Sequence, residues 1–133
     1  MKNRNIKIAV GFIKNINRKL IEEYIKSLEY DILELSESNY ERADLFILDA
    51  STARKIGEQL LELKLKQNIF VPIIIAIDKN DKAEKWLKAG FDDCLCMPFS
   101  KIELKTRIDI LLKLRTQSIE LKKTQRSSLQ NNI

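Results

Sequence analysis

Two carboxylates stand directly after long apolar runs. Asp49 follows ADLFIL, and Asp78 follows FVPIIIAI. If the two runs are neighbouring strands, the carboxylates lie near each other and could bind a cation weakly. The competing interpretation is structural: Asp49 accepts hydrogen bonds as a cap or in a loop, and Asp78 or Asp81 caps the next helix.

The cysteines and the absence of histidine limit other chemistry. Cys94 and Cys96 are spaced to lie on the same side of one strand, which is poor geometry for a disulfide. The chain has no histidine, and two thiols are too few ligands for a structural zinc site. We interpret both cysteines as small buried apolar residues. Without histidine, the usual general base of enzymes is missing.

Glycine is scarce as well. The only three glycines, Gly11, Gly57 and Gly90, can build neither a Rossmann nor a P-loop phosphate site. We therefore predict that the chain is not an enzyme, holds no metal and uses no cofactor.

The elements that position these residues alternate between strand and helix. We expect strands at 6–10, 30–35, 44–48, 70–77 and 93–97. We expect helices at 15–28, from Ser51 or Thr52 to about 66, at 81–89, and from Ser100 onward. The central strands are apolar throughout, as in a parallel sheet that is covered on both faces. The prediction is a doubly wound α/β fold with five parallel strands in the order 2-1-3-4-5. Its function would lie at the carboxyl ends of strands 1, 3 and 4.

The length, charge and apolar content of the chain limit the kinds of partner that it can bind. The 133 residues suit one domain with a core, and the net charge is +5. The lysines are interleaved with glutamates, which is typical of solvated helix faces and disfavours nucleic-acid binding. No apolar run is long enough to span a bilayer, and the start is not a signal peptide. We expect a cytoplasmic protein without membrane contact.

Three stretches resemble the receiver domain of bacterial two-component response regulators. They are ADLFILDAS, VPIIIAI and KAGFDDCLCMPFSKIEL, and the resemblance covers about residues 5–115. It implies a flavodoxin-like (CheY-like) fold. It also makes Asp49 the candidate phosphoacceptor and implies a cis peptide bond before Pro98.

The other positions that the family uses for phosphorylation have changed. The resemblance places Gly11 and Phe12 where the family has two magnesium-binding acids. It places Ile77 at the Ser/Thr position, Met97 at the lysine position and Cys94 at the aromatic switch position. Without these partners, nothing neutralises the charge of a transferred phosphoryl group. We predict an atypical, or pseudo-, receiver.

The segment between the second and third strands is short. SESNYERA leaves too few residues for two loops and a full helix. We expect helix 2 to be shortened or absent, which would leave apolar surface exposed for a partner.

The last predicted helix is longer than the sheet of the domain can cover. KIELKTRIDILLKLRTQSIELKKTQ contains no glycine or proline. We expect a receiver-like domain at 1–116 and a helical linker at 117–133 that leads to an output domain. The helix is expected to pass Arg115 and to pair with a second copy through Leu111, Leu114, Ile119 and Leu121. The competing interpretation is a frayed, monomeric tail, because Lys122, Lys123 and Arg126 repel their mates in a parallel pair.

Two functions follow. The favoured one is a phosphorylation-independent signalling module that acts by protein contact. Its long last helix would regulate a C-terminal output region, for example a diguanylate cyclase or kinase domain. The alternative is a genuine receiver that is phosphorylated on Asp49.

Overall fold

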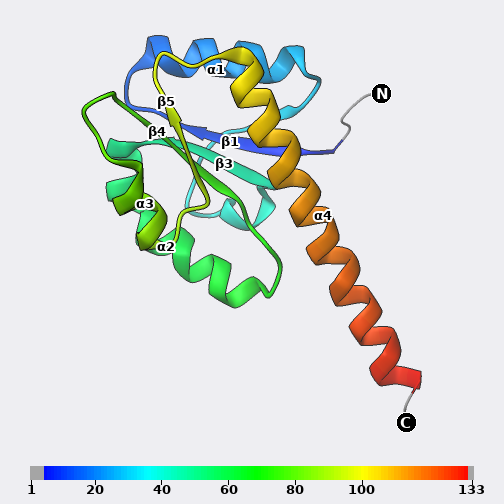
Figure 1. Cartoon of the computed structure of the whole chain (residues 1–133). Helices are drawn as coiled ribbons and strands as arrows, with labels where there is room; N and C mark the ends of the chain where they lie inside the picture. The colour runs from blue at the N-terminus through cyan, green and yellow to red at the C-terminus, as the bar shows by residue number, and fades with distance from the viewer. Residues whose placement is uncertain (1–4, 132–133) are drawn as a thin grey trace.

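The computed structural model describes residues 5–131, and it describes side chains up to residue 127. Strands and helices alternate along the chain (Figure 1). The strands are β1 (Lys7–Gly11), β2 (Asp31–Leu33), β3 (Leu45–Asp49), β4 (Ile73–Ile77) and β5 (Asp93–Cys96). The α-helices are α1 (Asn15–Ser27), α2 (Ala50–Gln67), α3 (Ala83–Ala89) and α4 (Lys101–Asn131).

The strands form one parallel sheet in the order β2-β1-β3-β4-β5. The predicted order 2-1-3-4-5 is therefore confirmed. The register places Gly11 beside Leu48, and Asp49 beside Ala76. The ends of β1, β3 and β4 thus meet at the same edge of the sheet, where parallel α/β folds carry their sites.

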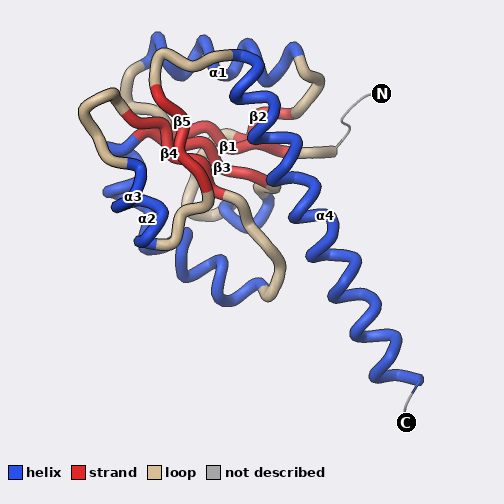
Figure 2. The backbone as a smooth tube through the Cα atoms, in the orientation of Figure 1, coloured by secondary structure: helices blue, strands red, loops and turns tan. Residues whose placement is uncertain are grey.

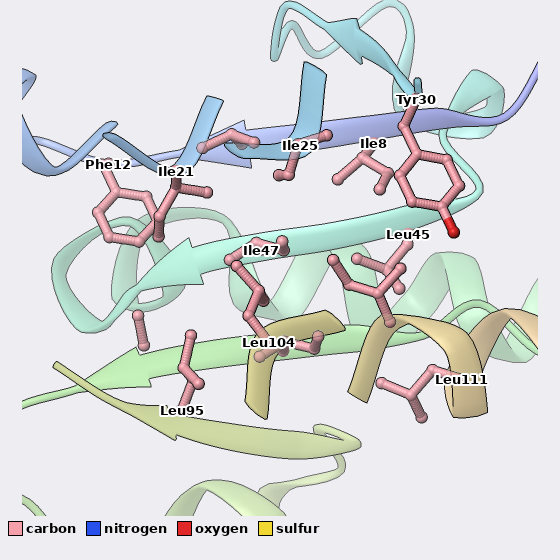
Figure 3. Close-up of a cluster of buried hydrophobic side chains, with 14 residues drawn as sticks. Ile8, Phe12, Ile21, Ile25, Tyr30, Leu45, Ile47, Leu95, Leu104 and Leu111 are labelled. Carbon is pink, nitrogen blue, oxygen red and sulfur yellow. The ribbon is translucent and has the colours of Figure 1, made fainter. Parts of the chain in front are cut away.

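Helices cover both faces of the sheet (Figure 2). Ile21 and Ile25 of α1 and Leu104 and Ile108 of α4 pack on one face, in the cluster that Figure 3 shows. The other face carries residues of α2 and α3, with Leu60 and Trp86 among them. All five residues of β4 and the first four of β3 are buried, as their apolar sequences predict for strands covered on both sides.

The expected shortening of helix 2 concerned the connection between β2 and β3. The second α-helix along the chain, α2, is present with 18 residues, and it follows β3. The segment that motivated the expectation, residues 36–43, contains the three-residue 3-10 helix Tyr40–Arg42. Tyr40 packs edge-on against Phe46, so this turn covers part of the α2 side of the sheet.

Several boundaries differ from the prediction. β4 begins at Ile73, after Pro72, whose ring nitrogen cannot donate to a neighbouring strand. α2 begins at Ala50 and its N-cap is Asp49, where we expected Ser51 or Thr52. α3 begins at Ala83, and its N-cap Lys82 makes no side-chain capping bond. α3 ends at Ala89, and its C-cap Gly90 has a φ of 120°, a conformation that L side chains rarely adopt.

α4 is a single helix of 31 residues, so the boundary expected at 116/117 falls inside it. Beyond that point Ser118 and Lys122 still bond to the body: Ser118 Oγ accepts from Phe70 N at 2.9 Å, and Lys122 Nζ donates to Gln67 O at 3.4 Å. The four residues expected to form one pairing surface differ in exposure. Leu111 is buried in the core and Ile119 is half-buried, whereas Leu114 and Leu121 are exposed. Within residues 5–131, no helix is long and apolar enough to cross a membrane.

Candidate functional site

Asp49 lies at the carboxyl end of β3 and both of its carboxylate oxygens accept backbone hydrogen bonds. Oδ1 accepts from Thr52 N at 2.8 Å, which caps the first turn of α2. Oδ2 accepts from Ile13 N at 2.9 Å, which fixes the loop between β1 and α1. The carboxylate thus satisfies two donors that would otherwise lack partners, a structural role that a strand-to-helix aspartate commonly has.

A cavity of ≈ 220 Å³ opens beside Asp49. Its walls come from the β1–α1 loop, the start of α2, the end of β4 and the residue before the cis-proline. The lining residues are Phe12, Ile13, Lys14, Asn17, Asp49, Ala50, Ser51, Arg54, Ala76, Asp78, Asp81 and Met97. Asp49 and Asp78 therefore face one cavity, as the ends of two adjacent strands predict.

Gly11 and Phe12, the positions at which the resemblance places magnesium-binding acids, are closely surrounded by apolar groups. A side chain built on Gly11 would place its Cβ 2.9 Å from methyl carbons of Leu35, Leu48 and Thr52. Such a separation is far inside van der Waals contact. Phe12 is 6% exposed and packs in the core between the sheet, α1 and α4. A side chain at position 11 would therefore require these methyl groups to shift, and position 12 is occupied by a buried aromatic ring.

The magnesium ion that the resemblance implies does not fit these residues. Magnesium needs several oxygen ligands in an octahedral arrangement, and neither Gly11 nor Phe12 can supply a side-chain oxygen. Asp49 has both oxygens engaged with amides. Within the described part of the chain, no group of three or more His, Cys, Asp or Glu side chains is placed to hold a metal.

Ile77 and Met97 occupy different sides of the sheet. Ile77 is 4% exposed and belongs to the cluster under α2 and α3, so it does not line the cavity. Met97 lines the cavity, is half-buried and packs against the cluster under α1 and α4. The Met97–Pro98 peptide bond is cis. Neither side chain can contact a phosphoryl oxygen through a hydrogen bond or a charge.

Asp81, two residues before α3, bonds to the loop and to the first turns of that helix. Asp81 Oδ1 pairs with Lys85 Nζ at 2.9 Å and accepts from Lys82 N at 2.8 Å. Asp81 Oδ2 accepts from Trp86 Nε1 at 3.1 Å. The hydrogen bond from Lys85, followed by that from Trp86, lowers the pKa of Asp81. Asp81 thus stays ionised and serves α3, although it is not the N-cap residue.

The two cysteines differ in environment. Cys94 is 8% exposed, and burial, followed by the charge of Asp93, raises the pKa of its thiol to about 11. Cys96 is exposed, so the expectation that both would be buried is wrong for it. Both are free thiols. Cys94, which the resemblance places at the aromatic switch position, lies under α3, with its sulfur 3.9 Å from Ala83 O.

Three polar residues of the cavity were missed by sequence reasoning. Lys14 and Asn17 flank the start of α1, and Arg54 lies in the second turn of α2. The guanidinium of Arg54 lies 5.7 Å from the centre of the Trp86 ring, a cation–π contact. The available signal was their position just after the ends of β1 and β3, since helices that follow such strands start at the functional edge.

No protein-family model matches the chain. Among curated proteins, the transcriptional regulatory protein QseB of Haemophilus influenzae is 30% identical over 100 residues, which are 67% of this chain and 45% of that protein. The chain spans less than half the length of the curated relatives that it matches.

Solved structures are similar over most of the chain. The signal receiver domain of a protein from Vibrio parahaemolyticus has a TM-score of 0.71 at 21% identity, and the match covers 88% of this chain and 97% of that one. A response regulator receiver modulated diguanylate cyclase from Pelobacter carbinolicus has a TM-score of 0.67 at 22% identity, with 86% and 98% covered. The chain therefore has the CheY-like receiver fold of response regulators, the proteins of two-component signal transduction.

Proposed function

We propose that this chain is an atypical receiver module that works by protein contact, without phosphorylation of Asp49. The observation that carries the proposal is the commitment of both Asp49 oxygens to the amides of Ile13 and Thr52. A phosphoacceptor must instead present one oxygen to the donor. It also needs a metal and a cation to offset the developing charge, and Gly11, Phe12 and Met97 provide neither.

An exposed apolar surface on α1 supports action by contact. Ile16 and Leu20, four residues apart on one side of α1, are 69% and 50% exposed, and Ile13, in the loop that precedes the helix, is 58% exposed. Ile13 also lines the cavity beside Asp49. A cluster of this kind next to a site is typical of protein-binding surfaces. The partner class is a protein with a complementary apolar surface.

The second part of the proposal concerns output. α4 leaves the sheet and continues away from the body (Figure 1). A continuous helix can carry a change in the domain to a region that follows it. We assign this role to α4, with an output region such as a diguanylate cyclase or kinase domain. The Pelobacter carbinolicus neighbour, a response regulator receiver modulated diguanylate cyclase, supports that choice.

An NMR titration with magnesium and beryllofluoride, a phosphoryl mimic, tests the first part. The expected result is no shift of the Ile13 and Thr52 amide signals at millimolar reagent. Saturable shifts at both amides that vanish in Asp49→Asn would overturn it.

The alternative function, a receiver that is phosphorylated on Asp49, has one observation in its favour. Asp49 is half-exposed and lines a cavity whose walls also carry Lys14 and Arg54. Two cations near one carboxylate could attract a phosphodonor. The same titration separates the two functions, because only a receptive site binds the mimic.

A further inference from the structure

α4 has a second apolar face that its own domain does not cover. Leu104, Ile108 and Leu111 are buried against the sheet. Ile110, Leu114 and Leu121 are 54%, 45% and 60% exposed. Steps of four and seven residues place these three on one face of a helix. We call them the α4 stripe.

The charges beside the α4 stripe are self-complementary. Lys113 and Glu120 are seven residues apart, so both flank the stripe on the same side. Both are exposed. Within the described residues Lys113 has no ion pair, and Glu120 has only a loose contact with Lys123 at 3.6 Å, in which both side chains are largely exposed. The opposite flank carries the uncharged residues Ser118 and Gln125.

The stripe is already formed in the single chain. Arg115 Nη1 donates to Phe70 O at 2.9 Å, and Phe70 N donates to Ser118 Oγ at 2.9 Å. These bonds hold α4 on the body between Leu114 and Leu121. The helix therefore needs no partner to exist there, and binding costs little ordering of the backbone.

We propose that the α4 stripe binds the α4 stripe of a second copy of this chain in an antiparallel arrangement. In an antiparallel helix pair the same flanks face each other, so Lys113 of each copy meets Glu120 of the other. In a parallel pair opposite flanks meet, and Lys113 and Glu120 would face Ser118 and Gln125 without a charge partner. The two symmetric ion pairs select the antiparallel arrangement.

This inference deepens the proposed function, because it names the partner of the output helix. Its test uses no phosphate chemistry, so either can fail alone. Sedimentation equilibrium on the full chain is expected to show a dimer at tens of micromolar. Leu114→Ser and Leu121→Ser should each weaken the dimer by roughly tenfold or more, because each change removes an apolar side chain from both copies. The control Ile102→Ser, in the same helix and 80% exposed but off the stripe, should leave it unchanged.

Charge reversal then tests the orientation. Lys113→Glu and Glu120→Lys should each weaken the dimer, since each places like charges opposite one another. An equimolar mixture of the two variants should associate like the parent chain, and high salt should abolish this rescue. A monomeric parent, a loss in Ile102→Ser equal to that in Leu114→Ser, or a mixture as weak as its components would overturn the proposal.

Discussion

Ile13 N donates a hydrogen bond to Asp49 Oδ2 over 2.9 Å, so the first loop of the chain is fastened to the end of β3. The other oxygen of the same carboxylate caps α2 through Thr52 N. One side chain thereby joins a strand, a loop and a helix at the edge where receiver folds do their chemistry. The contacts of Asp49 at this edge are those of a structural aspartate.

Removing this carboxylate should destabilise the fold. Asp49→Ala loses a helix cap and a loop hydrogen bond, and we expect the free energy of unfolding to fall by about 1–3 kcal/mol. Asp78→Ala is the matched control, because Asp78 ends the adjacent strand and lines the same cavity. Its effect should stay within about 0.5 kcal/mol. Urea titration measures both. Equal effects, or a more stable Asp49→Ala, would show that Asp49 is not held for structure.

Restoring an acid at the end of β1 should be costly. Gly11→Asp drives a side chain into Leu35, Leu48 and Thr52, and we expect a loss of about 1–3 kcal/mol by urea titration. Ser51→Asp places an acid in the same cavity on the exposed first turn of α2, where a negative charge is favourable, and should be neutral or slightly stabilising. If Gly11→Asp unfolds at the same urea concentration as the parent, the position has room for an acid.

The two thiols should react at very different rates. At pH 8 a disulfide reagent is expected to modify Cys96 quickly and Cys94 only after unfolding, because burial raises the Cys94 pKa to about 11 and keeps the thiol protonated. Cys96→Ser should therefore abolish the fast phase, and Cys94→Ser should leave it intact. The raised pKa also means that Cys94 contributes stability below its unfolded pKa, and that this contribution is lost as pH rises toward about 11. Two fast equivalents in the native protein would contradict the assignment.

The anchor of α4 gives a fourth prediction. Arg115 Nε pairs with Asp44 Oδ1 at 3.2 Å, and Arg115 also bonds to Phe70 O. Arg115→Ala should cost about 1–2 kcal/mol and raise hydrogen exchange at the Phe70 amide, because the bonds that place Phe70 against α4 are weakened. Thr116→Ala, one residue later and exposed, is the control and should change neither quantity. A null effect of Arg115→Ala would mean that α4 is held by its apolar face alone.

Most of the fold could be predicted from the apolar pattern of the strands. Apolar runs such as FVPIIIAI predict buried parallel strands, and the order of the sheet follows from right-handed crossovers. Side-chain contacts between segments that are distant in the sequence could not be predicted. Nothing local in the sequence tells that Ser118 meets Phe70, or that Arg115 meets Asp44, because these residues lie 48 and 71 positions apart. The interruption of the apolar pattern at Ser118 is explained by this bond.

The sequence predicted which residues lie at the candidate site, but not how all of their side chains pack. Strand ends placed Asp49 and Asp78 at one cavity correctly. The alternation along β4 turns Ile77 to the α2 side and away from that cavity, a detail that depends on the register of the sheet. The engagement of Asp49 by Ile13 depends on the course of a loop, which no periodic pattern specifies.

Phosphoryl transfer from acetyl phosphate tests the central claim most directly. The full chain is incubated with acetyl phosphate and magnesium, with a receiver of known phosphoacceptor activity as positive control, and the intact mass is measured. We predict no phosphoryl adduct on the parent chain, and none on Met97→Lys, because the lysine alone does not restore the magnesium site. A stoichiometric adduct on the parent that disappears in Asp49→Asn would contradict the claim and establish Asp49 as a phosphoacceptor.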